Sequence, residues 1–310
     1  MNLEKTNSFP LVSIITVNYN QSLTTIDLLE SLSNISYPNI EIIVVDNASP
    51  NDNPSIMKEK HPSIILVESV INYGFAGGNN LGIMRARGDY VLLLNNDVVV
   101  PVGFLEPLVN KFLKNPGYGA ISPKIHYYHH PNTIQYAGFT QIDSKTVRNI
   151  TIGKGEQDKG QYDNDYETAY AHGAAMMVPM EVIKHVGLMS YEFFLYYEEA
   201  DWCQRIKNAG YKIGYVHNSM VRHKESVTTG KMGSLKVYYL TRNRLVFMRR
   251  NIYGSDFFIS LFYQIFIAIG KNALLYLLKG DVKIFSAYFK AIMWNIKNMF
   301  NVEIHDNPRL

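Results

Sequence analysis

Continuous apolar runs separated by amphipathic segments organise the first hundred residues. Four runs have the length and composition of strands that are covered on both faces of a sheet: 11–17 (LVSIITV), 40–45 (IEIIVV), 64–68 (IILVE) and 90–94 (YVLLL). Residues 20–34 place Ile26, Leu29 and Leu32 at helical spacing, and a glycine-rich turn and a helix over 77–88 precede the fourth run. Strands that alternate with helices predict a parallel sheet with helices on its faces.

Polar side chains follow three of these strands directly. Asn18 ends the first, Asp46 ends the second, and Asn95, Asn96 and Asp97 interrupt the apolar run between Leu94 and Val98. Each group alone is compatible with an ordinary turn, because Asn and Asp favour turns. Together they predict a ligand site, since ligands bind beyond the carboxyl ends of parallel strands. An unpaired buried carboxylate is costly, so we expect Asp97 to lie where the strand surfaces or beside a cation.

A second polar group follows an aromatic segment in the second half of the chain. Residues 193–197 (FFLYY) precede Glu198, Glu199 and Asp201, and a helical pattern then continues from about 200 to 209 and stops at Gly210. Acidic residues are favoured in a first helical turn, which is one explanation for them. The other is a carboxylate at the mouth of an apolar pocket, where it can act as a general base.

His223 follows the predicted strand 212–216. It is an ordinary buried or surface histidine, or, if it approaches Asp97, a metal ligand, since imidazole and carboxylate groups both bind Mn²⁺-like ions.

Composition excludes several classes of protein. A net charge of +3 over 310 residues is too small to indicate nucleic-acid binding, so no nucleic-acid partner is expected. The single cysteine, Cys203, excludes a disulfide framework, and residues 1–10 lack the apolar core of a secretory signal. Neither a G-x-G-x-x-G pattern after the first strand nor a P-loop occurs, which argues against a dinucleotide-dependent dehydrogenase.

The C-terminal quarter is apolar and basic. The run 257–269 (FFISLFYQIFIAI) is interrupted by Gly270, Lys271 and Asn272, and we expect it to be too short for a membrane span of about 20 residues. The region is either a helical extension packed on the main domain or an amphipathic surface that lies on an anionic membrane leaflet. Residues 141–170 are polar and predict a long, mobile excursion.

Seven blocks in order carry a family resemblance: 12–21, 41–49, 72–83, 90–98, 173–216, 221–226 and 238–250. Together they resemble family 2 glycosyltransferases with the GT-A fold, in particular the bacterial rhamnosyltransferase-like branch that builds cell-surface polysaccharides. The resemblance implies an α/β fold with a Rossmann-like mixed, mostly parallel sheet that has helices on both faces. It also implies a catalytic domain over 10–235 and a C-terminal helical, possibly membrane-associated region over 236–310.

The resemblance assigns the nucleotide-sugar to the strand ends and to the glycine-rich block: Thr16, Asn18, Asp46, Asn72, Gly74, Phe75, Gly78 and Asn79. Glycines in that block let the backbone approach a ligand closely. The Asp-x-Asp element, which binds the metal and the diphosphate in the family, occurs here as Asn95, Asn96 and Asp97. Only Asp97 offers a carboxylate, which makes His223 more important as a second metal ligand.

The family's base motif occurs here as Glu198 and Glu199, with Asp201 as a further acidic residue. The resemblance therefore implies an inverting transfer in which Glu199 is the general base. The donor is dTDP-rhamnose or a UDP-sugar, Mn²⁺ or Mg²⁺ is the cofactor, and a lipid-linked glycan is the acceptor. The enzyme is expected in the cytoplasm, peripheral on the inner face of the cell membrane. The alternative function is a non-catalytic sugar-nucleotide-binding protein.

Two acceptor contacts are left open by the sequence. Trp202 and the aromatic run 193–197 either form a platform for an acceptor sugar or belong to the core. Arg242 and Arg244 either contact a diphosphate-lipid acceptor or lie on a solvated helix face.

Overall fold

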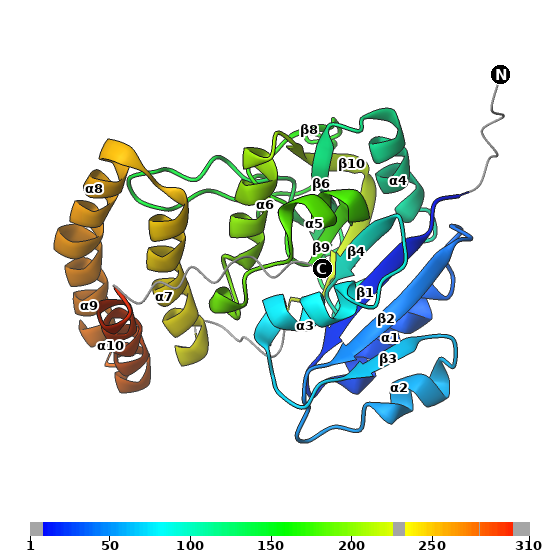
Figure 1. Cartoon of the computed structure of the whole chain (residues 1–310), viewed down its shortest axis with the longest axis horizontal. Helices are drawn as coiled ribbons and strands as arrows, with labels where there is room; N and C mark the ends of the chain where they lie inside the picture. Colours follow the sequence, from blue (N-terminus) through cyan, green and yellow to red (C-terminus); the bar gives the residue numbers. More distant parts are fainter. Residues whose placement is uncertain (1–8, 226–232, 279, 300–310) are drawn as a thin grey trace.

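The computed structural model describes residues 9–225, 233–278 and 280–299. Within these residues, ten strands form one sheet in the order β3-β2-β1-β4-β9-β6-β10-β5, with β7 beside β6 and β8 beside β10 (Figure 1). The strands are β1 (Val12–Asn18), β2 (Ile40–Asp46), β3 (Ile65–Glu68), β4 (Tyr90–Leu94), β5 (Val98–Val99), β6 (Tyr118–Tyr127), β7 (Ile134–Tyr136), β8 (Tyr166–Glu167), β9 (Ala175–Pro179) and β10 (Lys212–His223). The secretory-signal prediction concerns residues that lie almost entirely outside the described ones.

Helices cover both faces of the sheet, because neighbouring side chains on each strand point to opposite sides. One face packs against α1 (Ser22–Leu32) and α4 (Leu105–Lys114), where Ile14 shares a core with Leu28 and Leu108. The other packs against α3 (Gly74–Ile83), α5 (Met180–Val186) and α6 (Glu198–Asn208), where Ile15 shares a core with Ile206. The short helix α2 (Ser55–Lys60) completes a small cluster at the β2–β3 edge.

The predicted parallel arrangement holds for the first four strands. β3, β2, β1 and β4 are all parallel, and their carboxyl ends meet at one edge. β9 then runs antiparallel between β4 and β6, so the second half of the sheet is mixed rather than mostly parallel. β10 continues past the predicted end at residue 216, because a register shift between Val216 and Met220 lets it keep pairing with β6 as far as His223.

The C-terminal part is helical, as predicted. It comprises α7 (Ser234–Asn251), α8 (Gly254–Tyr263), a π-helical turn η2 (Gln264–Ala268), α9 (Ile269–Leu278) and α10 (Val282–Lys297). Val246 and Phe247 of α7 form a core with Ala200 of α6 and with Phe193 of the short 3₁₀ helix η1 (Tyr191–Phe193), and α10 packs on α7 (Figure 1).

α8, η2 and α9 form one continuous helix from Gly254 to Leu278. It has 25 residues, and an 18-residue stretch of it has a mean hydropathy of 1.6, so it is long and apolar enough to cross a membrane by length and composition. The prediction that this apolar run is too short was wrong, because the helix continues through the interruption at Gly270. At 1.5 Å per residue its length is about 37 Å.

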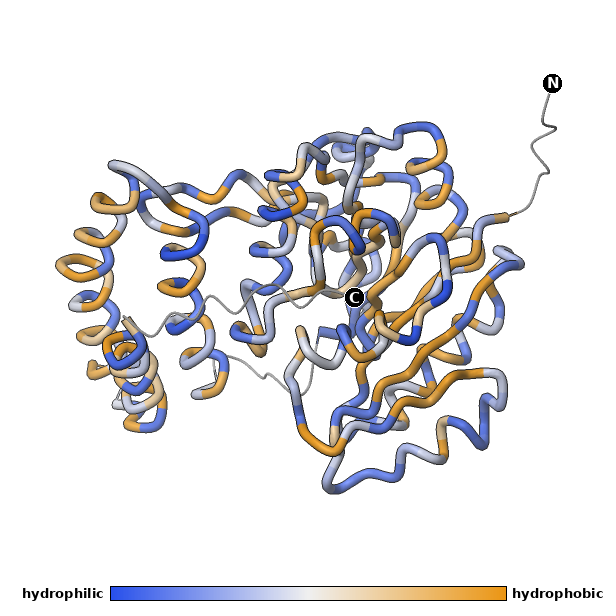
Figure 2. The backbone as a smooth tube through the Cα atoms, in the orientation of Figure 1, coloured by the Kyte–Doolittle hydropathy of each residue, from blue (hydrophilic) through white to orange (hydrophobic). Residues whose placement is uncertain are grey.

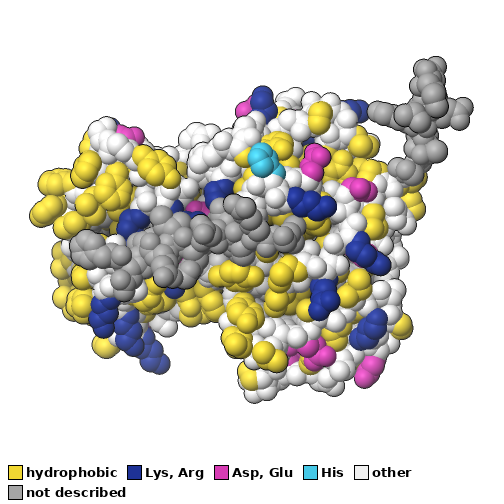
Figure 3. Space-filling model, in the orientation of Figure 1, with side chains coloured by type: hydrophobic (Ala, Val, Ile, Leu, Met, Phe, Trp, Pro, Cys, Tyr) yellow, Lys and Arg dark blue, Asp and Glu magenta, His cyan; other side chains and the backbone are white. Residues whose placement is uncertain are grey.

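The two faces of this helix have an unusual distribution of polarity. The inward face is polar or small: Ser260, Gln264 and Ala268 are buried, and Gln264 donates to the Thr146 carbonyl. The outward face carries exposed large apolar residues: Phe258, Ile259, Phe262, Ile265, Phe266, Ile267, Leu274, Leu275, Leu277 and Leu278. Figure 2 shows the apolar residues along α8 and α9, and Figure 3 shows hydrophobic side chains gathered over this end of the molecule. A helix in water has the opposite arrangement.

The excursion 141–170 packs on these helices. Val147 is buried, the Val147 carbonyl accepts from Tyr197 Oη at 3.2 Å, and Ser144 donates to Asp256 at 2.6 Å. The excursion thus connects the sheet domain to α6 and α8, and its predicted mobility stays a prediction.

Candidate active site

A hydrogen-bond network joins the ends of β1, β2 and β4. Asn18 donates to Asp46 at 2.8 Å and accepts from Thr25 at 2.9 Å, while Asn96 donates to Thr25 at 3.1 Å. Asp46 also accepts from the Ser49 hydroxyl at 2.6 Å. The three polar strand ends predicted from the sequence are therefore connected, and the network fixes the floor of one crevice.

The glycine-rich block borders the same crevice. Asn47 at the end of β2 donates to Asn72 at 3.0 Å and to the Gly74 carbonyl at 2.9 Å. Gly74 has φ +69°, and a Cβ there would lie 2.2 Å from the Phe194 carbonyl oxygen. That carbonyl accepts from the Phe75 amide at 2.7 Å, so glycine permits the close approach of α3 to the loop before α6. α3 consequently begins at Gly74, three residues earlier than predicted.

Some predicted nucleotide contacts lie behind the surface of the crevice. Thr16 and Asn18 are fully buried, and Asn79 is 2% exposed and donates to the Phe75 carbonyl. A Cβ at Gly78 would lie 2.9 Å from Val17, which makes Gly78 a packing residue between α3 and β1. These four residues shape the site, whereas Asn72 and Phe75 are partly exposed and remain available as candidate contacts. Asp46 is 4% exposed, and both of its oxygens accept hydrogen bonds from Asn18 or Ser49.

Asp97 and His223 come together as predicted, at the ends of β4 and β10. Asp97 Oδ1 lies 3.0 Å from His223 Nε2, and both side chains are less than a tenth exposed. His223 Nδ1 lies 2.9 Å from Gln135 Oε1, which can only accept, so Nδ1 carries a proton and Nε2 is the ring nitrogen that faces Asp97. Asp97 Oδ2 and His223 Nε2 have no hydrogen-bond partner among the described residues.

This donor set fits a divalent cation. A carboxylate and an imidazole oriented by a second polar group are usual ligands of Mn²⁺, and a cation satisfies both buried atoms. No group of three or more Asp, Glu, His or Cys side chains arranged to hold a metal occurs within 9–225, 233–278 and 280–299. Any metal here would thus have two protein ligands from this set, leaving positions open for other oxygen ligands.

His172 is a site residue that the sequence analysis did not single out. Its ring centroid lies 6.4 Å from that of His223, and its Nδ1 accepts from the Ala174 amide at 3.0 Å, which places the proton on Nε2. Burial lowers the pKa of His172 to about 3, so the ring is neutral. Its Nε2–H is thus a hydrogen-bond donor near His223. Only its position in AHGAA, before β9, could have indicated it.

Glu198 and Glu199 form a carboxyl pair at the start of α6, in which Glu198 is buried and Glu199 is partly exposed. Burial raises the pKa of Glu199 to about 7, and burial together with the charge of Glu199 raises the pKa of Glu198 well above its usual range. Glu199 therefore ionises first and Glu198 keeps its proton. Glu199 Cδ lies 4.0 Å from where a Gly173 Cβ would stand, and Phe75 lies on the same side at 3.6 Å, so Glu199 faces the glycine-rich block.

Activity is expected to depend on pH through Glu199. A base works as the carboxylate, and a pKa raised to about 7 means that this form is lost as the pH falls through 7. We expect kcat/KM to rise with pH to a plateau above neutrality, with a midpoint near pH 7. A pH–rate profile from about 5 to 9 measures this, and a profile that stays flat down to pH 5, as a glutamate with the ordinary pKa of about 4.3 would give, contradicts it.

Asp201 has a structural rather than a catalytic position. It is 1% exposed, and it binds Arg205 at 3.1 Å, Arg250 at 3.0 Å and Asn251 at 3.0 Å. Both of its oxygens are thus occupied by α6 and α7, which corrects the sequence-based assignment. Trp202 is likewise fully buried and donates to the Gly187 carbonyl, so it belongs to the core and not to an acceptor platform.

The loop before Glu198 is strained and held by α7. Phe194, Tyr196 and Tyr197 all have positive φ, at 61°, 70° and 76°, a conformation that costs about 1–2 kcal/mol per residue. Asn243 Nδ2 donates to the carbonyls of three residues of this loop, at 2.7 to 2.8 Å: Phe193, Leu195 and Tyr196. The interaction of α7 with the loop therefore sets where Glu199 stands.

Arg242 also holds the loop before Glu198, and together with Asn243 it forms a clamp on that loop. It is 8% exposed, donates to the Glu192 and Phe193 carbonyls, and stacks between Tyr239 and Trp294. Neither predicted alternative for Arg242, an acceptor contact or a solvated face, matches this burial. Arg244 bonds to the Tyr197 hydroxyl at 3.2 Å.

We expect Asn243→Ala to lower kcat about 10-fold or more with a smaller change in donor KM, because the two N–H groups of the amide, which three loop carbonyls share, are lost, and a hydrogen bond is worth roughly 1 kcal/mol. The pH midpoint is also expected to fall, since a loosened loop exposes Glu199 to water. Asn298→Ala removes a similar amide–carbonyl bond at the end of α10 and serves as the control. Equal effects of the two variants on kcat and pH midpoint contradict a positioning role.

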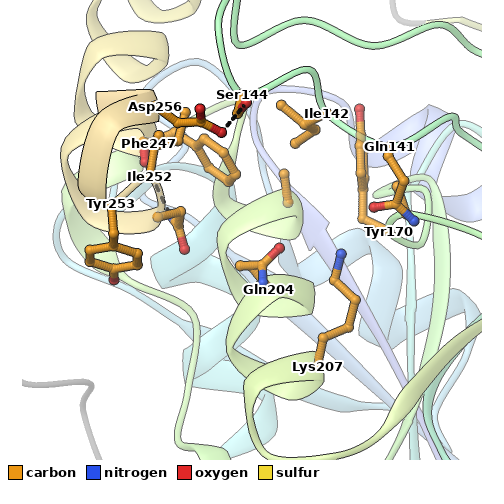
Figure 4. A pocket seen from close by; sticks show the side chains of 13 residues that line it. Gln141, Ile142, Ser144, Tyr170, Gln204, Lys207, Phe247, Ile252, Tyr253 and Asp256 are labelled. Carbon is orange, nitrogen blue, oxygen red and sulfur yellow. Dashed lines mark hydrogen bonds between the residues drawn. The ribbon is translucent and has the colours of Figure 1, made fainter. Parts of the chain in front are cut away.

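A separate cavity lies between α6, the end of α7 and the excursion. It has a volume of about 180 Å³, and Gln204 and Lys207 of α6 point into it toward Tyr170 and Gln141 (Figure 4). None of the predicted site residues lines it. The cavity is therefore distinct from the crevice at the strand ends.

Comparison with known proteins gives the same family that the sequence resemblance predicted. The sequence pattern of the family described as Glycosyl transferase family 2 matches residues 13–187. The low-salt glycan biosynthesis hexosyltransferase Agl10 of Haloferax volcanii is 28% identical over 245 residues, which cover 76% of this chain and 74% of Agl10. The N-acetylglucosaminyl-diphospho-decaprenol L-rhamnosyltransferase of Mycobacterium tuberculosis is 23% identical, over 71% of this chain and 78% of that protein.

Two solved structures share the fold. The mannosyltransferase PcManGT of Pyrobaculum calidifontis, in complex with GDP-Man and Mn²⁺, has a TM-score of 0.58 at 17% identity and covers 96% of this chain and 89% of its own. GalNAc-T7 with UDP, GalNAc and Mn²⁺ has a TM-score of 0.59 at 14% identity and covers 94% of this chain and 59% of its own. These likenesses confirm the GT-A fold predicted from the sequence. With the family match over more than half of its length, the chain belongs to glycosyl transferase family 2 and is a glycosyltransferase.

Proposed function

We propose that the protein transfers a sugar from a nucleoside-diphosphate sugar to a hydroxyl of a lipid-linked glycan, with inversion, in cell-surface polysaccharide biosynthesis. The observation that carries this proposal is the Glu198–Glu199 pair facing the glycine-rich block, with the pKa of Glu199 raised to about 7. A base with a pKa near the working pH is what acceptor activation requires. dTDP-rhamnose is the first candidate donor, since the mycobacterial relative is named as an L-rhamnosyltransferase, and a UDP-sugar is the second.

The donor lies across the strand ends in this proposal. Asp46 receives the nucleoside, and Asn72, Gly74 and Phe75 border it. Asn95 and Asn96 lie beside the diphosphate at the end of β4. Asp97 and His223 would hold Mn²⁺ or Mg²⁺, which supplies positive charge to stabilise the leaving diphosphate.

Glu199 performs the proton transfer. Its carboxylate takes the proton of the acceptor hydroxyl, whose oxygen attacks the anomeric carbon from the face opposite the diphosphate, through an oxocarbenium-like transition state of the kind that glycosidases use. The bond from the anomeric carbon to the diphosphate oxygen breaks as the glycosidic bond forms. Glu198, protonated beside it, keeps the pair at a single negative charge.

In this proposal, residues 10–235 form the catalytic domain and residues 236–310 form a membrane-associated region. The outward apolar face of α8 and α9 supports membrane contact, because such a face is costly in water and favourable among lipid tails. We place the enzyme in the cytoplasm, at the inner face of the cell membrane. The hydrogen bonds of Arg242 and Asn243 to the Phe193 carbonyl support a contribution of α7, in the second region, to the site.

Nucleotide release separates an enzyme from a non-catalytic sugar-nucleotide-binding protein. The purified chain is incubated with dTDP-, UDP-, GDP- and CDP-sugars, each with Mn²⁺, with Mg²⁺ or with EDTA. We expect slow release from one donor only when metal is present. Binding of a donor without release, even after glycan acceptors are added, contradicts the transferase proposal and favours the binding protein.

A further inference from the structure

The basic side chains of the C-terminal helices divide into two groups. The arginines of α7 are engaged within the protein: Arg242 with the 192–193 carbonyls, Arg244 with Tyr197, Arg249 with the Asn295 carbonyl and Arg250 with Asp201. Lys283 and Lys290 of α10 are exposed, and no ion pair or hydrogen bond engages either side chain among the described residues. Lys236 of α7 and Lys271 of α9 also make no ion pair or hydrogen bond within the described part of the chain, so the positive charge that an anionic ligand of this region can pair with is carried by lysines, among them Lys283 and Lys290.

Both lysines line one groove between α10 and the N-terminal half of α7. The groove has a volume of about 530 Å³ and is formed by Ser234, Leu235, Tyr238, Val282, Lys283, Ser286, Ala287 and Lys290. None of the described residues that line it is acidic. The lysines are seven residues apart on one helix face, about 10 Å along the axis, so their flexible side chains can converge on a ligand with two charged groups.

An apolar surface borders the groove. Leu277 and Leu278, at the end of α9, are 61% and 76% exposed, and Val282 and Leu235 of the groove itself are 77% and 54% exposed. Figure 3 shows basic side chains next to hydrophobic ones at this end of the molecule. Positive charge beside a continuous apolar face is complementary to an amphiphile with an anionic head.

The groove is close to the reacting region through α7. Tyr238 lines the groove, and its ring contacts Tyr239 edge to face at 5.0 Å. Tyr239 in turn stacks on Phe194, in the loop that precedes Glu199, at 5.0 Å. In the sequence, Ser234 follows His223 by only eleven residues. A ligand headgroup in the groove is thus separated by one helix, α7, from the loop that precedes Glu199.

We propose that this groove binds the diphosphate of a lipid-linked acceptor, a proposal that rests on the proposed function. Lys283 and Lys290 pair with the diphosphate, and the lipid follows the apolar face of α9 into the bilayer. The glycan then extends past the N-terminal end of α7 toward Glu199. Binding in the groove would thereby fix the distance between the lipid diphosphate and the hydroxyl that reacts.

The test uses farnesyl diphosphate in detergent micelles as the probe, with the full chain. Lys283→Gln/Lys290→Gln is compared with Lys271→Gln/Lys297→Gln, which neutralises two exposed lysines that do not line the groove. We expect the Kd for farnesyl diphosphate to rise roughly 10- to 30-fold in the first variant and to change less than about twofold in the second. Thermal unfolding of both variants checks that they fold.

Three results overturn the proposal: an unchanged Kd in the groove variant, an equal rise in both variants, or an equal weakening of binding to plain phosphatidylglycerol vesicles. The last would mean that the lysines bind anionic lipid in general. Nucleotide release by the unmodified enzyme is measured separately. If the unmodified enzyme releases nucleotide but does not bind farnesyl diphosphate, the groove is refuted and the transferase function stands, whereas a lack of nucleotide release with intact, lysine-dependent binding refutes the transferase function.

Discussion

Glu199→Gln is expected to lower kcat by roughly 10²- to 10⁴-fold, the usual contribution of a positioned general base. The amide has the same shape but cannot accept the proton of the acceptor hydroxyl. Because Glu199 does not hold the nucleotide in this account, the Kd of the donor is expected to stay within a few fold. Single-turnover transfer and a donor titration measure the two quantities separately. The rise of activity around pH 7 should also disappear.

Glu198→Gln is the matched control. Glu198 is protonated in our account, since burial and the neighbouring Glu199 raise its pKa, so a neutral amide replaces a neutral acid. We expect a much smaller loss of kcat than for Glu199→Gln. If Glu198→Gln is the more damaging of the two, the roles within the pair are reversed. Full activity of Glu199→Gln removes the base assignment altogether.

Asp97→Asn is expected to reduce kcat/KM by about 100-fold or more and to abolish the response to Mn²⁺. Asparagine keeps the size of the side chain but removes the charge that faces His223, and cation stabilisation of a leaving diphosphate is worth several kcal/mol, at about 1.4 kcal/mol per tenfold in rate. Titration of Mn²⁺ followed by electron paramagnetic resonance, with and without nucleoside diphosphate, reports the metal directly.

Glu68→Gln provides the comparison for Asp97→Asn. Glu68 is an exposed carboxylate at the end of β3, in the same row of strand ends. Its substitution should leave Mn²⁺ binding and turnover unchanged. Asp97→Asn with normal Mn²⁺ affinity and metal-dependent turnover would show that the cation is held elsewhere.

The fold was predictable where local pattern and tertiary structure agree. The strands that end at Asn18 and Asp46 and the strand before Asn95 occur almost as predicted, because buried parallel strands have unbroken apolar runs. The antiparallel insertion of β9 depends on contacts distant in the sequence and has no local signal. The long helix through Gly270 was missed because a glycine and a lysine lower local hydropathy without breaking helical hydrogen bonds.

The site was predictable in its parts but not in its connections. Asp97, His223 and Glu199 were each indicated by residue type and by the family resemblance. Their sequence positions could not show that Asp201, two residues after Glu199, points to Arg205 and Arg250. The clamp from Asn243 joins segments about fifty residues apart, and its effect depends on three positive-φ residues that composition does not reveal. His172 lacks any motif of its own.

The configuration of the product tests the central claim most directly. The responding donor and an acceptor are converted with the full chain, and the new glycosidic bond is assigned by NMR from its anomeric coupling constant. A single displacement assisted by Glu199 predicts the configuration opposite to that of the donor. Retention of the donor configuration would contradict the account, because it requires a second displacement or attack from the same face as the leaving diphosphate.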